Sequence, residues 1–372
     1  MSAKLAASFS RFSVELGLRD NEPENPHSVA KYMREWLEKT KNWLLVFDNA
    51  ASDENEKLLQ EKEDLIKIFR SECNHGSILI TSRDEKLIRK FGGVELRQLN
   101  EEDAVELLIT RTKVDQANFN QSSIDEEIEA ARRIFENTDY NPLGIIGISD
   151  IIRRDSTRLT DFYASYSNQH SLNTVWRRQF EKLNKDALNL LNMMAYLDPD
   201  RIQLKMLRQC SGVSHKKDLE IISSPRKFDH LRSTLIQNSL VSYNEELQEL
   251  RVNRPVQAYC RSRMTLQDRC KSFKLGVAIV KQSWPSQTRG IMYDPALLPG
   301  RIDYLSHVES LCQHYTRSLD GLDSPLIPED KVNWEFPSIL YEAGWMCYEK
   351  GLFDLAQDLL GLGGGFFRFT LQ

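Results

Sequence analysis

Two short runs of apolar residues without alternation lie in the first hundred positions of the chain. Trp43–Phe47 runs into a single carboxylate, Asp48, and residues 77–80 run into the polar sequence Thr-Ser-Arg-Asp at 81–84. Continuous apolar runs of this length are typical of strands covered on both faces of a parallel sheet. The right-handed crossover rule places two such strands side by side. We therefore predict adjacent parallel strands, with Asp48 and Arg83 at the same edge of the sheet.

The residues at this edge suggest phosphate chemistry. Ligands of parallel sheets lie at the carboxyl ends of the strands, where Asp48 could hold phosphate-bound magnesium and Arg83 could contact a terminal phosphate. A structural alternative is that Asp48 caps a helix in the acidic stretch 52–70, and that Arg83 is a surface side chain paired with Asp84 or Glu85. Both alternatives stay open from these residues.

Helical periodicity replaces the strand pattern after about residue 100. Residues 94–108 predict a short strand followed by a helix, with Asn100 as the helix cap. Apolar residues at helical spacing then recur from Asp125 onward, and Pro142 is placed to begin a further helix. Six apolar residues predict one continuous helical stripe before a break at Asp198 and Pro199: Trp176, Phe180, Leu183, Ala187, Leu191 and Met194.

Residues 231–264 predict a helix, a hairpin and a second helix. The hairpin pairs residues 240–243 with residues 250–252 across an Asn-Glu-Glu turn, which makes it a candidate wing. Basic residues in 224–235 lie on a helix that could touch DNA phosphates, so a winged-helix DNA-binding regulator is one alternative. The acidic balance of the chain argues against that alternative.

The order of four motifs resembles a known family. WLLVFDN, ILITSRD, LNEEDAVELL and NPLGIIGISDIIRR are similar to the NB-ARC branch of the STAND signalling ATPases, above all to fungal NOD-like receptor proteins with tetratricopeptide repeats. The resemblance implies a Walker B role for Asp48 with Mg²⁺, a terminal-phosphate role for Arg83, and contacts of Pro142 and Leu143 with the base. It also implies ADP or ATP as ligand, conformational switching and oligomerisation.

The chain departs from that family in features of chemical importance. A triphosphate is normally held by a glycine-rich loop with a lysine, and no Gly-Lys pair occurs in the sequence. Asn49 follows Asp48 where a second acid could polarise water, so we predict no ATPase activity and weak or lost nucleotide binding. Asn253 stands where related receptors have a histidine that touches the bound diphosphate. We expect the chain to begin after the first strand of such a fold.

The C-terminal segment resembles a single tetratricopeptide repeat. Gly344 lies where helices pack closely, Gly351 lies at an inter-helix turn, Phe353 is a predicted wedge, and Ala356 is a small contact residue. A structural alternative is an ordinary helical hairpin that closes the preceding helices. The resemblance implies protein partners through this repeat, and the corresponding alternative function is a non-catalytic interaction scaffold.

The predicted fold class is α/β followed by mostly α. It comprises a partial P-loop-NTPase-like parallel sheet, a helical subdomain, a winged helix and the start of a tetratricopeptide-repeat array. The predicted divisions are a partial nucleotide-binding domain at 1–98, a helical subdomain at 99–170, a winged helix at 171–265, a helical linker at 266–335, one repeat at 336–360 and a tail at 361–372.

Composition narrows the setting and the partners. The 372 residues are 41% apolar, carry a formal net charge of -5 and include six scattered cysteines without a C-x-x-C pair. No apolar run reaches the roughly 18 residues of a membrane span, so we expect a cytoplasmic protein with free thiols and without membrane or nucleic-acid partners. His307, Cys312 and His314 lie close in sequence but match no standard zinc spacing.

Overall fold

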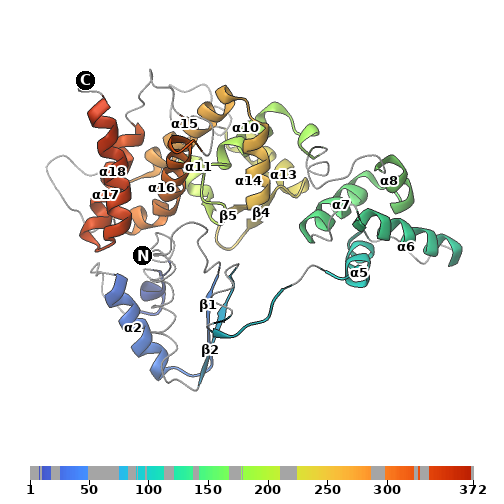
Figure 1. The fold of residues 1–372 in the computed structure, drawn as a ribbon, viewed down its shortest axis with the longest axis horizontal. Helices are drawn as coiled ribbons and strands as arrows, with labels where there is room; N and C mark the ends of the chain where they lie inside the picture. Colours follow the sequence, from blue (N-terminus) through green and yellow to red (C-terminus); the bar gives the residue numbers. More distant parts are fainter. Residues whose placement is uncertain are drawn as a thin grey trace. The chain divides into compact units, whose positions relative to one another are not determined.

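The protein is mostly helical, with a small parallel sheet and a small antiparallel sheet (Figure 1). It divides into two compact units, Met1–Glu95 with Val277–Gln372, and Leu96–Gly276. Each unit is described by itself. The computed structural model describes residues 8, 11–17, 26–48, 75–82, 89, 91–96, 99–112, 121–136, 142–166, 177, 179–209, 224–285, 298–321, 326 and 335–369.

The parallel sheet of the first unit confirms the predicted pairing. Strands β1 (Trp43–Phe47) and β2 (Gly76–Ile80) pair in parallel, with Trp43 opposite Gly76 and Phe47 opposite Ile80. A Cβ atom on Gly76 would lie 2.0 Å from the Trp43 ring, so the absence of a side chain lets the indole lie over the neighbouring strand. The Trp43 indole N–H donates a 2.9 Å hydrogen bond to the carbonyl of Leu37, in helix α2 (Pro26–Lys39).

One face of this sheet differs from the prediction of two covered faces. Leu45 is buried, but Leu44, Val46 and Leu79 keep 62%, 49% and 51% of their surface exposed. The register places Leu44 opposite Ser77 and Val46 opposite Leu79, so these residues belong to the same face. Parallel strands normally carry a layer on each side, and the described residues provide only partial cover for this one.

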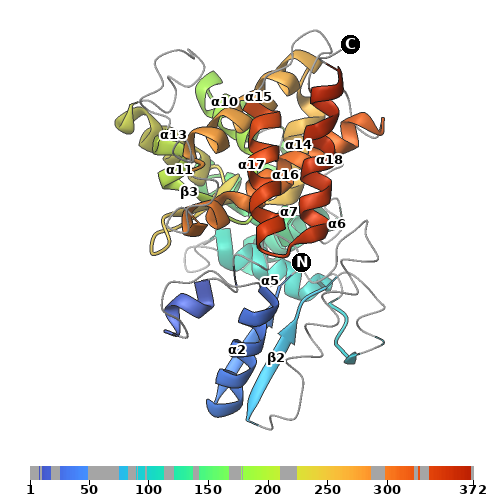
Figure 2. The ribbon, with the colours of Figure 1, turned by 90° about the vertical axis from the view of Figure 1, so that its left-hand side faces the viewer.

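Long helices complete the first unit. They are the end of α15 (Leu266–Ser283), α16 (Leu298–Leu319), α17 (Glu335–Glu349) and α18 (Phe353–Phe369). Figure 2 shows α17 and α18 side by side, joined at Gly351, which has a φ of 70°. The left-handed conformation at that turn favours glycine.

The α17–α18 hairpin confirms two predicted contacts and corrects a boundary. A Cβ atom on Gly344 would lie 2.6 Å from Cγ of Leu360, so close packing of the helices requires glycine there, and Ala356 is buried as predicted. The predicted wedge, Phe353, is instead 60% exposed. Helix α18 continues to Phe369 through the glycine-rich segment that we expected to be a separate tail. Gly363 lies close to Leu340 of α17, and this packing compensates for the low helix propensity of glycine.

Four helices of the second unit enclose one apolar core. They are α5 (Glu101–Thr112), α6 (Gln121–Glu136), α7 (Pro142–Asp155) and α8 (Leu159–Tyr166), and Leu108, Ile145 and Ile148 are among the buried residues between them. Helix α7 begins at Pro142, as predicted. Buried Glu127 of α6 accepts hydrogen bonds from the backbone N–H of Leu159 and from Thr160 Oγ1, both at 2.8 Å. This carboxylate satisfies free donors at the beginning of α8.

Of the two predictions for the segment before α5, one is correct and one is wrong. Asn100 Oδ1 accepts a 2.7 Å hydrogen bond from the backbone N–H of Asp103, which confirms Asn100 as the cap. The predicted short strand is wrong for residues 92–96, which are neither helix nor strand. Val94 and Leu96 are almost fully exposed there, so no partner strand or apolar layer supports their β propensity.

The remainder of the second unit is a module of helices and a small antiparallel sheet, which we call the hairpin module (residues 179–264). It contains α10 (Lys185–Met194), β3 (Ile202–Gln203), α11 (Leu204–Gln209), α13 (Pro225–Gln237), β4 (Val241–Asn244), β5 (Glu249–Val252) and α14 (Arg254–Arg263). The strand order is β3-β5-β4, and β4 pairs with β5 antiparallel, which confirms the predicted hairpin.

The predicted single stripe before this hairpin is wrong as one helix. Helix α10 begins at Lys185, because Asn184 adopts an extended conformation and its side chain accepts a 2.8 Å hydrogen bond from Ala187 N. Phe180 is buried but precedes this break, and Trp176 lies outside the described residues. A strong N-cap residue therefore divides a pattern that apolar spacing alone would read as continuous.

Candidate functional site

The carboxyl edge of the parallel sheet brings together a carboxylate and a hydroxyl. Asp48 follows β1, Thr81 follows β2, and Thr81 Oγ1 donates a 2.6 Å hydrogen bond to Oδ1 of exposed Asp48. The Thr81 backbone N–H also donates to the carbonyl of Phe47 at 2.9 Å, so the strand pairing fixes this edge. Oxygen ligands of this kind suit Mg²⁺, which commonly uses one or two carboxylates together with phosphates and waters.

Two other predicted residues of this edge, Asn49 and Arg83, lie outside the described residues, as does the acidic stretch 52–70. Among the residues that the structure describes, no group of three or more His, Cys, Asp or Glu side chains could hold a metal ion. At this edge Asp48 and Thr81 supply a carboxylate and a hydroxyl oxygen. A magnesium ion bound there would need phosphates or waters as its other ligands. The predicted terminal-phosphate contact of Arg83 stays a prediction.

Pro142, Leu143 and Asn253 belong to the second unit, whereas Asp48 belongs to the first. Pro142 is the exposed first residue of α7, where its missing N–H costs no helical hydrogen bond. The side chain of Leu143 lies outside the described residues. The base contacts predicted for Pro142 and Leu143 and the diphosphate contact predicted for Asn253 stay predictions.

Asn253 lies between the hairpin and the last helix of the module. It precedes α14, is exposed, and makes no side-chain cap hydrogen bond. Its neighbour Arg254 donates a 2.6 Å hydrogen bond to Oδ2 of Asp200, and both side chains are about half exposed. The predicted contact of Asn253 with a diphosphate remains a prediction, and the arginine beside it is engaged within the module.

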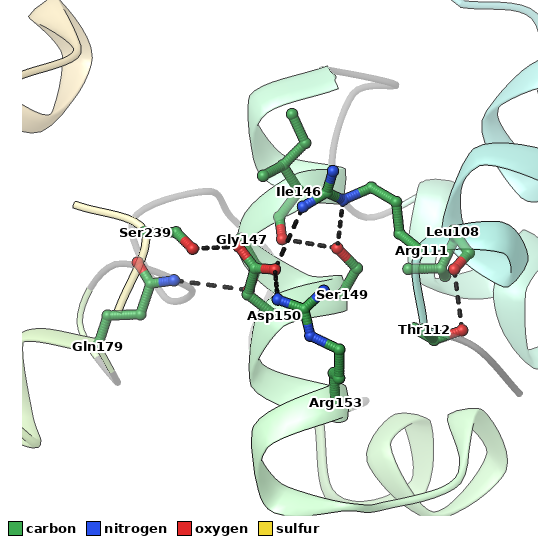
Figure 3. A network of polar contacts seen from close by, with 10 residues as sticks. All are labelled: Leu108, Arg111, Thr112, Ile146, Gly147, Ser149, Asp150, Arg153, Gln179 and Ser239. Carbon is green, nitrogen blue, oxygen red and sulfur yellow. Dashed lines mark hydrogen bonds and ion pairs between the residues drawn. The ribbon is translucent and has the colours of Figure 1, made fainter. Parts of the chain in front are cut away.

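A buried aspartate of α7 organises a polar network that sequence patterns did not reveal (Figure 3). Oδ1 of Asp150 accepts hydrogen bonds from Nη2 of Arg153 at 3.0 Å and from Nη2 of Arg111 at 3.3 Å. Oδ2 accepts from the hydroxyl of Ser239, in the turn before β4. Arg111 Nε also donates to Ser149 Oγ at 3.1 Å. Because a buried carboxylate requires such partners, these contacts tie α7 to α5 and to the hairpin module.

A second set of polar contacts joins the end of α7 to the hairpin module. Arg154 donates through Nη1 to Oδ1 of Asn238, and Lys182 Nζ donates to both carboxylate oxygens of Asp155 at 2.9 and 2.8 Å. Partial burial acts to raise the pKa of Asp155, but the hydrogen bonds and charges of Lys182 and Arg154 outweigh it and lower that pKa below its ordinary value. Asp155 therefore favours its charged form.

The sequence contains only a weak signal for these two sets of contacts. Arg154 and Asp155 were visible as charges after an apolar stretch, but their partners Asn238 and Lys182 lie 84 and 27 positions away, and Ser239 lies 89 positions from Asp150. Ser239 adopts a φ of 54°, which a sequence pattern does not predict for serine. Long-range polar partners of this kind become visible only once the helices are packed.

The structure gives no support for DNA recognition by α13. Two of its basic residues are engaged inside the module: Lys227 Nζ lies 2.7 Å from Oδ2 of Asp186, and Arg232 stacks over the Tyr243 ring at 4.8 Å while pairing with Asp229, whereas Arg226 is exposed. Phosphate contacts would have to compete with these pairs. We therefore do not propose the DNA-binding alternative.

The described cysteines are free thiols in apolar surroundings. Burial raises the pKa of both Cys260 and Cys312 to about 12, and burial also raises the pKa of Cys347. These thiols stay neutral and unreactive near pH 7. Cys73 and Cys210 lie outside the described residues.

Comparison with protein families matches the hairpin module. Residues 178–269 match the model of a domain of unknown function (DUF7779). No curated protein matches the chain. The matched model names neither an NB-ARC domain nor a tetratricopeptide repeat, but its bounds agree closely with the module that the structure shows between α8 and α15.

The described helices also bear on the membrane question. None of them is long and apolar enough to cross a bilayer.

Proposed function

We propose that this chain is an NB-ARC-type signalling switch protein in which nucleotide binding is weak or lost and hydrolysis is absent. The supporting observation is the in-register parallel pairing of β1 and β2, which places Asp48 and Thr81 at one carboxyl edge. Strand pairing with an acid at this edge is the arrangement that phosphate-handling sheets use for Mg²⁺. In this proposal the sheet belongs to a P-loop-NTPase-like fold.

The order of the other modules supports the same proposal. A four-helix group in which α7 begins at Pro142 precedes the hairpin module, and the α17–α18 hairpin comes last. In the proposed family these parts correspond to a helical subdomain, a winged helix and a tetratricopeptide-like repeat. The contacts of Asp150 and Arg154 would hold the first two in a single state, and breaking them would release the helical group from the turn before β4.

The chemistry of the edge explains why hydrolysis is absent from the proposal. Asp48 and Thr81 supply oxygen ligands for a magnesium ion shared with phosphates, but the 372 residues contain no Gly-Lys pair to neutralise a triphosphate. Charge stabilisation of this kind is commonly the largest catalytic contribution. The sequence also has Asn49 after Asp48, where a second acid could polarise water.

A nucleotide titration tests this proposal. We expect a fluorescent ADP analogue with Mg²⁺ to bind with a Kd above about 100 μM, because each 1.4 kcal/mol of lost phosphate contact weakens binding about tenfold. Asp48→Ala should weaken binding further in Mg²⁺ but not in EDTA, whereas Asp320→Ala, at an exposed aspartate after α16, should change nothing. ATP turnover should not exceed the blank.

Each other result has a defined meaning. Turnover that disappears in Asp48→Ala would contradict the absence of hydrolysis, and binding tighter than about 1 μM would contradict the loss of nucleotide control. Binding that Asp48→Ala leaves unchanged in Mg²⁺ would remove the proposed role of the sheet edge. The complete absence of binding would be the lost-binding case of the proposal, and it would agree with the second candidate function as well.

That second candidate is a non-catalytic interaction scaffold, and a specific surface favours it. Helix α17 and the first residue of α18 expose four large aromatic side chains that contact one another. Exposed apolar patches of this kind commonly mark interaction sites. A scaffold would keep its partner binding when nucleotide is absent and when Asp48 is replaced.

A further inference from the structure

An unbroken row of aromatic rings lies on the surface of the α17–α18 hairpin. Tyr341, Trp345 and Tyr348 recur at intervals of four and three residues on α17, so they share one helix face, and Phe353 begins α18. Their exposed fractions are 50%, 42%, 54% and 60%. We call this set of four residues the aromatic ladder.

The rings of the aromatic ladder hold one another in edge-to-face contact. Successive ring centroids are 6.3 Å apart for Tyr341 and Trp345, 5.7 Å for Trp345 and Tyr348, and 5.6 Å for Tyr348 and Phe353. Such contacts restrict the side chains before any partner arrives, which lowers the entropy lost on binding. Close packing at Gly344 fixes the helix below them.

The charges around the aromatic ladder are almost all acidic. Residues 335–364 carry five carboxylates and a single basic residue, Lys350, which is buried. Glu349 and Asp358 are exposed, whereas Glu342 is paired with Lys281 of α15. Glu349 directly follows Tyr348 and Asp354 directly follows Phe353, so two carboxylates adjoin the aromatic ladder in sequence.

We propose that the aromatic ladder binds an amphipathic helix of another protein that carries arginine or lysine next to its apolar residues. Aromatic faces attract guanidinium and ammonium groups, and the carboxylates add attraction of the same sign. The chain already uses this chemistry internally, because Arg263 lies over the Phe180 ring at 4.9 Å and Arg232 over the Tyr243 ring at 4.8 Å. Tyr341, Trp345 and Tyr348 share one helix face, which a partner helix can contact through side chains at matching helical spacing.

Charge decides against three other occupants of this surface. In a symmetric pair of two copies, the carboxylates beside the ladder would face carboxylates of the same kind, and like charges disfavour such a contact. Nucleic acid and anionic lipid surfaces are repelled for the same reason. A basic segment of a different protein is the occupant that matches both the rings and the charges.

This inference deepens the scaffold candidate and uses only the α17–α18 hairpin. It does not depend on Asp48 or on any nucleotide. The nucleotide titration and the peptide experiment below can therefore fail separately. Nucleotide turnover or tight nucleotide binding would contradict the switch proposal. The absence of peptide binding would remove the aromatic ladder as a binding site.

Fluorescence polarisation with the full chain tests the proposal. The probe is a labelled helical peptide of about 16 residues with leucine on one face and arginine beside it, and the matched peptide carries glutamate in place of each arginine. We expect the arginine peptide to bind at least about tenfold more tightly than the glutamate peptide. We also expect Trp345→Ala and Tyr348→Ala each to weaken it about tenfold or more.

Control variants separate the ladder from general effects. Tyr32→Ala removes a 41% exposed aromatic ring from α2 and should leave peptide binding unchanged. Glu349→Gln should weaken binding about threefold at low salt and less at high salt, because salt screens exposed charges. Circular dichroism should show unchanged folding, since the substituted side chains are substantially exposed.

Four results would overturn the proposal. They are the absence of peptide binding, equal binding of the two peptides, binding unaffected by Trp345→Ala and Tyr348→Ala, and a dimer in light scattering that Trp345→Ala dissociates. The last result would assign the aromatic ladder to a second copy of the chain.

Discussion

The two sheets of this protein differ in their strand sequences and in their surroundings. In the parallel pair, Leu44, Val46 and Leu79 leave one face exposed. In the antiparallel sheet, whose strands mix polar and apolar residues, Leu250 and Val252 of the central strand β5 are buried against the helices of the hairpin module. A strand-like sequence therefore predicts that a strand forms and pairs, but the layers around it determine how much stability that strand contributes.

Polar groups differ between these two regions as well. In the hairpin module, buried Gln257 of α14 donates to the carbonyls of Met194 at 2.8 Å and Leu197 at 3.0 Å, and Arg261 donates to the carbonyl of Ala195. Carbonyls at the end of α10 thus have buried donors, as helix ends require. At the parallel edge, the Thr81 to Asp48 hydrogen bond is exposed. The module thus satisfies carbonyls at a helix end with its own side chains, whereas the hydrogen bond at the parallel edge is exposed to solvent.

The largest expected effect compares one leucine from each sheet. Leu250→Ala should destabilise the hairpin module by about 2–5 kcal/mol, because it removes a fully buried side chain. Leu44→Ala should change stability by less than about 0.5 kcal/mol, because its side chain is mostly exposed. Hydrogen exchange across a urea series, read on peptides from each sheet, measures both. Equal losses of stability in the two variants would contradict the proposed difference between the sheets.

The second test measures how the stability of the hairpin module changes at alkaline pH. Burial raises the pKa of Cys260 in the folded module to about 12, against about 8.5 when unfolded. The stability associated with the neutral thiol is complete below about pH 8.5 and decreases as pH rises toward the folded pKa, by about 1.4 kcal/mol per pH unit. Cys260→Ala should thus reduce the loss between pH 8.5 and 10 by about 2 kcal/mol.

Cys270→Ala is the control for that measurement. Burial also raises the pKa of Cys270, but this residue is only partly buried, so its contribution to the alkaline loss should be smaller. Urea midpoints measured at pH 7, 8.5 and 10 give the slopes. A slope that Cys260→Ala leaves unchanged would show that this thiol ionises equally in both states.

The third test compares the amide hydrogen exchange of the two sheets. Amides of β1 and β2 should exchange at least about tenfold faster, or about 1.4 kcal/mol less protected, than those of β4 and β5. The reason is that the parallel pair has little apolar cover on one face. Native-state hydrogen exchange with mass spectrometry resolves the two sheets. Stronger protection of β1 and β2 would show that the exposed face does not weaken the parallel pair.

The smallest effect concerns a helix end inside the module. Asn184→Ala should destabilise it by about 1 kcal/mol, because the cap hydrogen bond to Ala187 N is lost. Asn189→Ala, in the middle of α10, should be neutral or slightly stabilising, because alanine has the higher helix propensity. Thermal unfolding of both variants measures the difference, and equal effects would show that the cap contributes nothing specific.

Local signals in the sequence predicted much of this structure. The parallel pairing of Trp43–Phe47, the hairpin before Asn253, the cap at Asn100 and the beginning of α7 at Pro142 all depend on neighbouring residues and are confirmed. Errors occurred where a second local signal competed with the first. Asn184 interrupts the apolar stripe, and close packing carries α18 through its glycines.

The candidate site was less predictable than the fold. Asp48 was identified because it follows a strand, but its hydrogen-bond partner was found only in the structure, at Thr81. The Asp150 network was missed because its members come from α5, α7 and the turn at Ser239. Side chains that meet through packing of distant elements leave no regular spacing in a sequence.

The close packing of Leu360 against Gly344 has a mechanical consequence for the α17–α18 hairpin. Leu360 fits where Gly344 lacks a side chain, and a slide of one helical turn, about 5.4 Å, would bring it against Leu340 or Tyr348 instead. Both of those residues carry bulky groups, so the two helices cannot ratchet along each other. Force applied at one end of α17 should therefore be transmitted to α18 as the rotation of a single stiff lever.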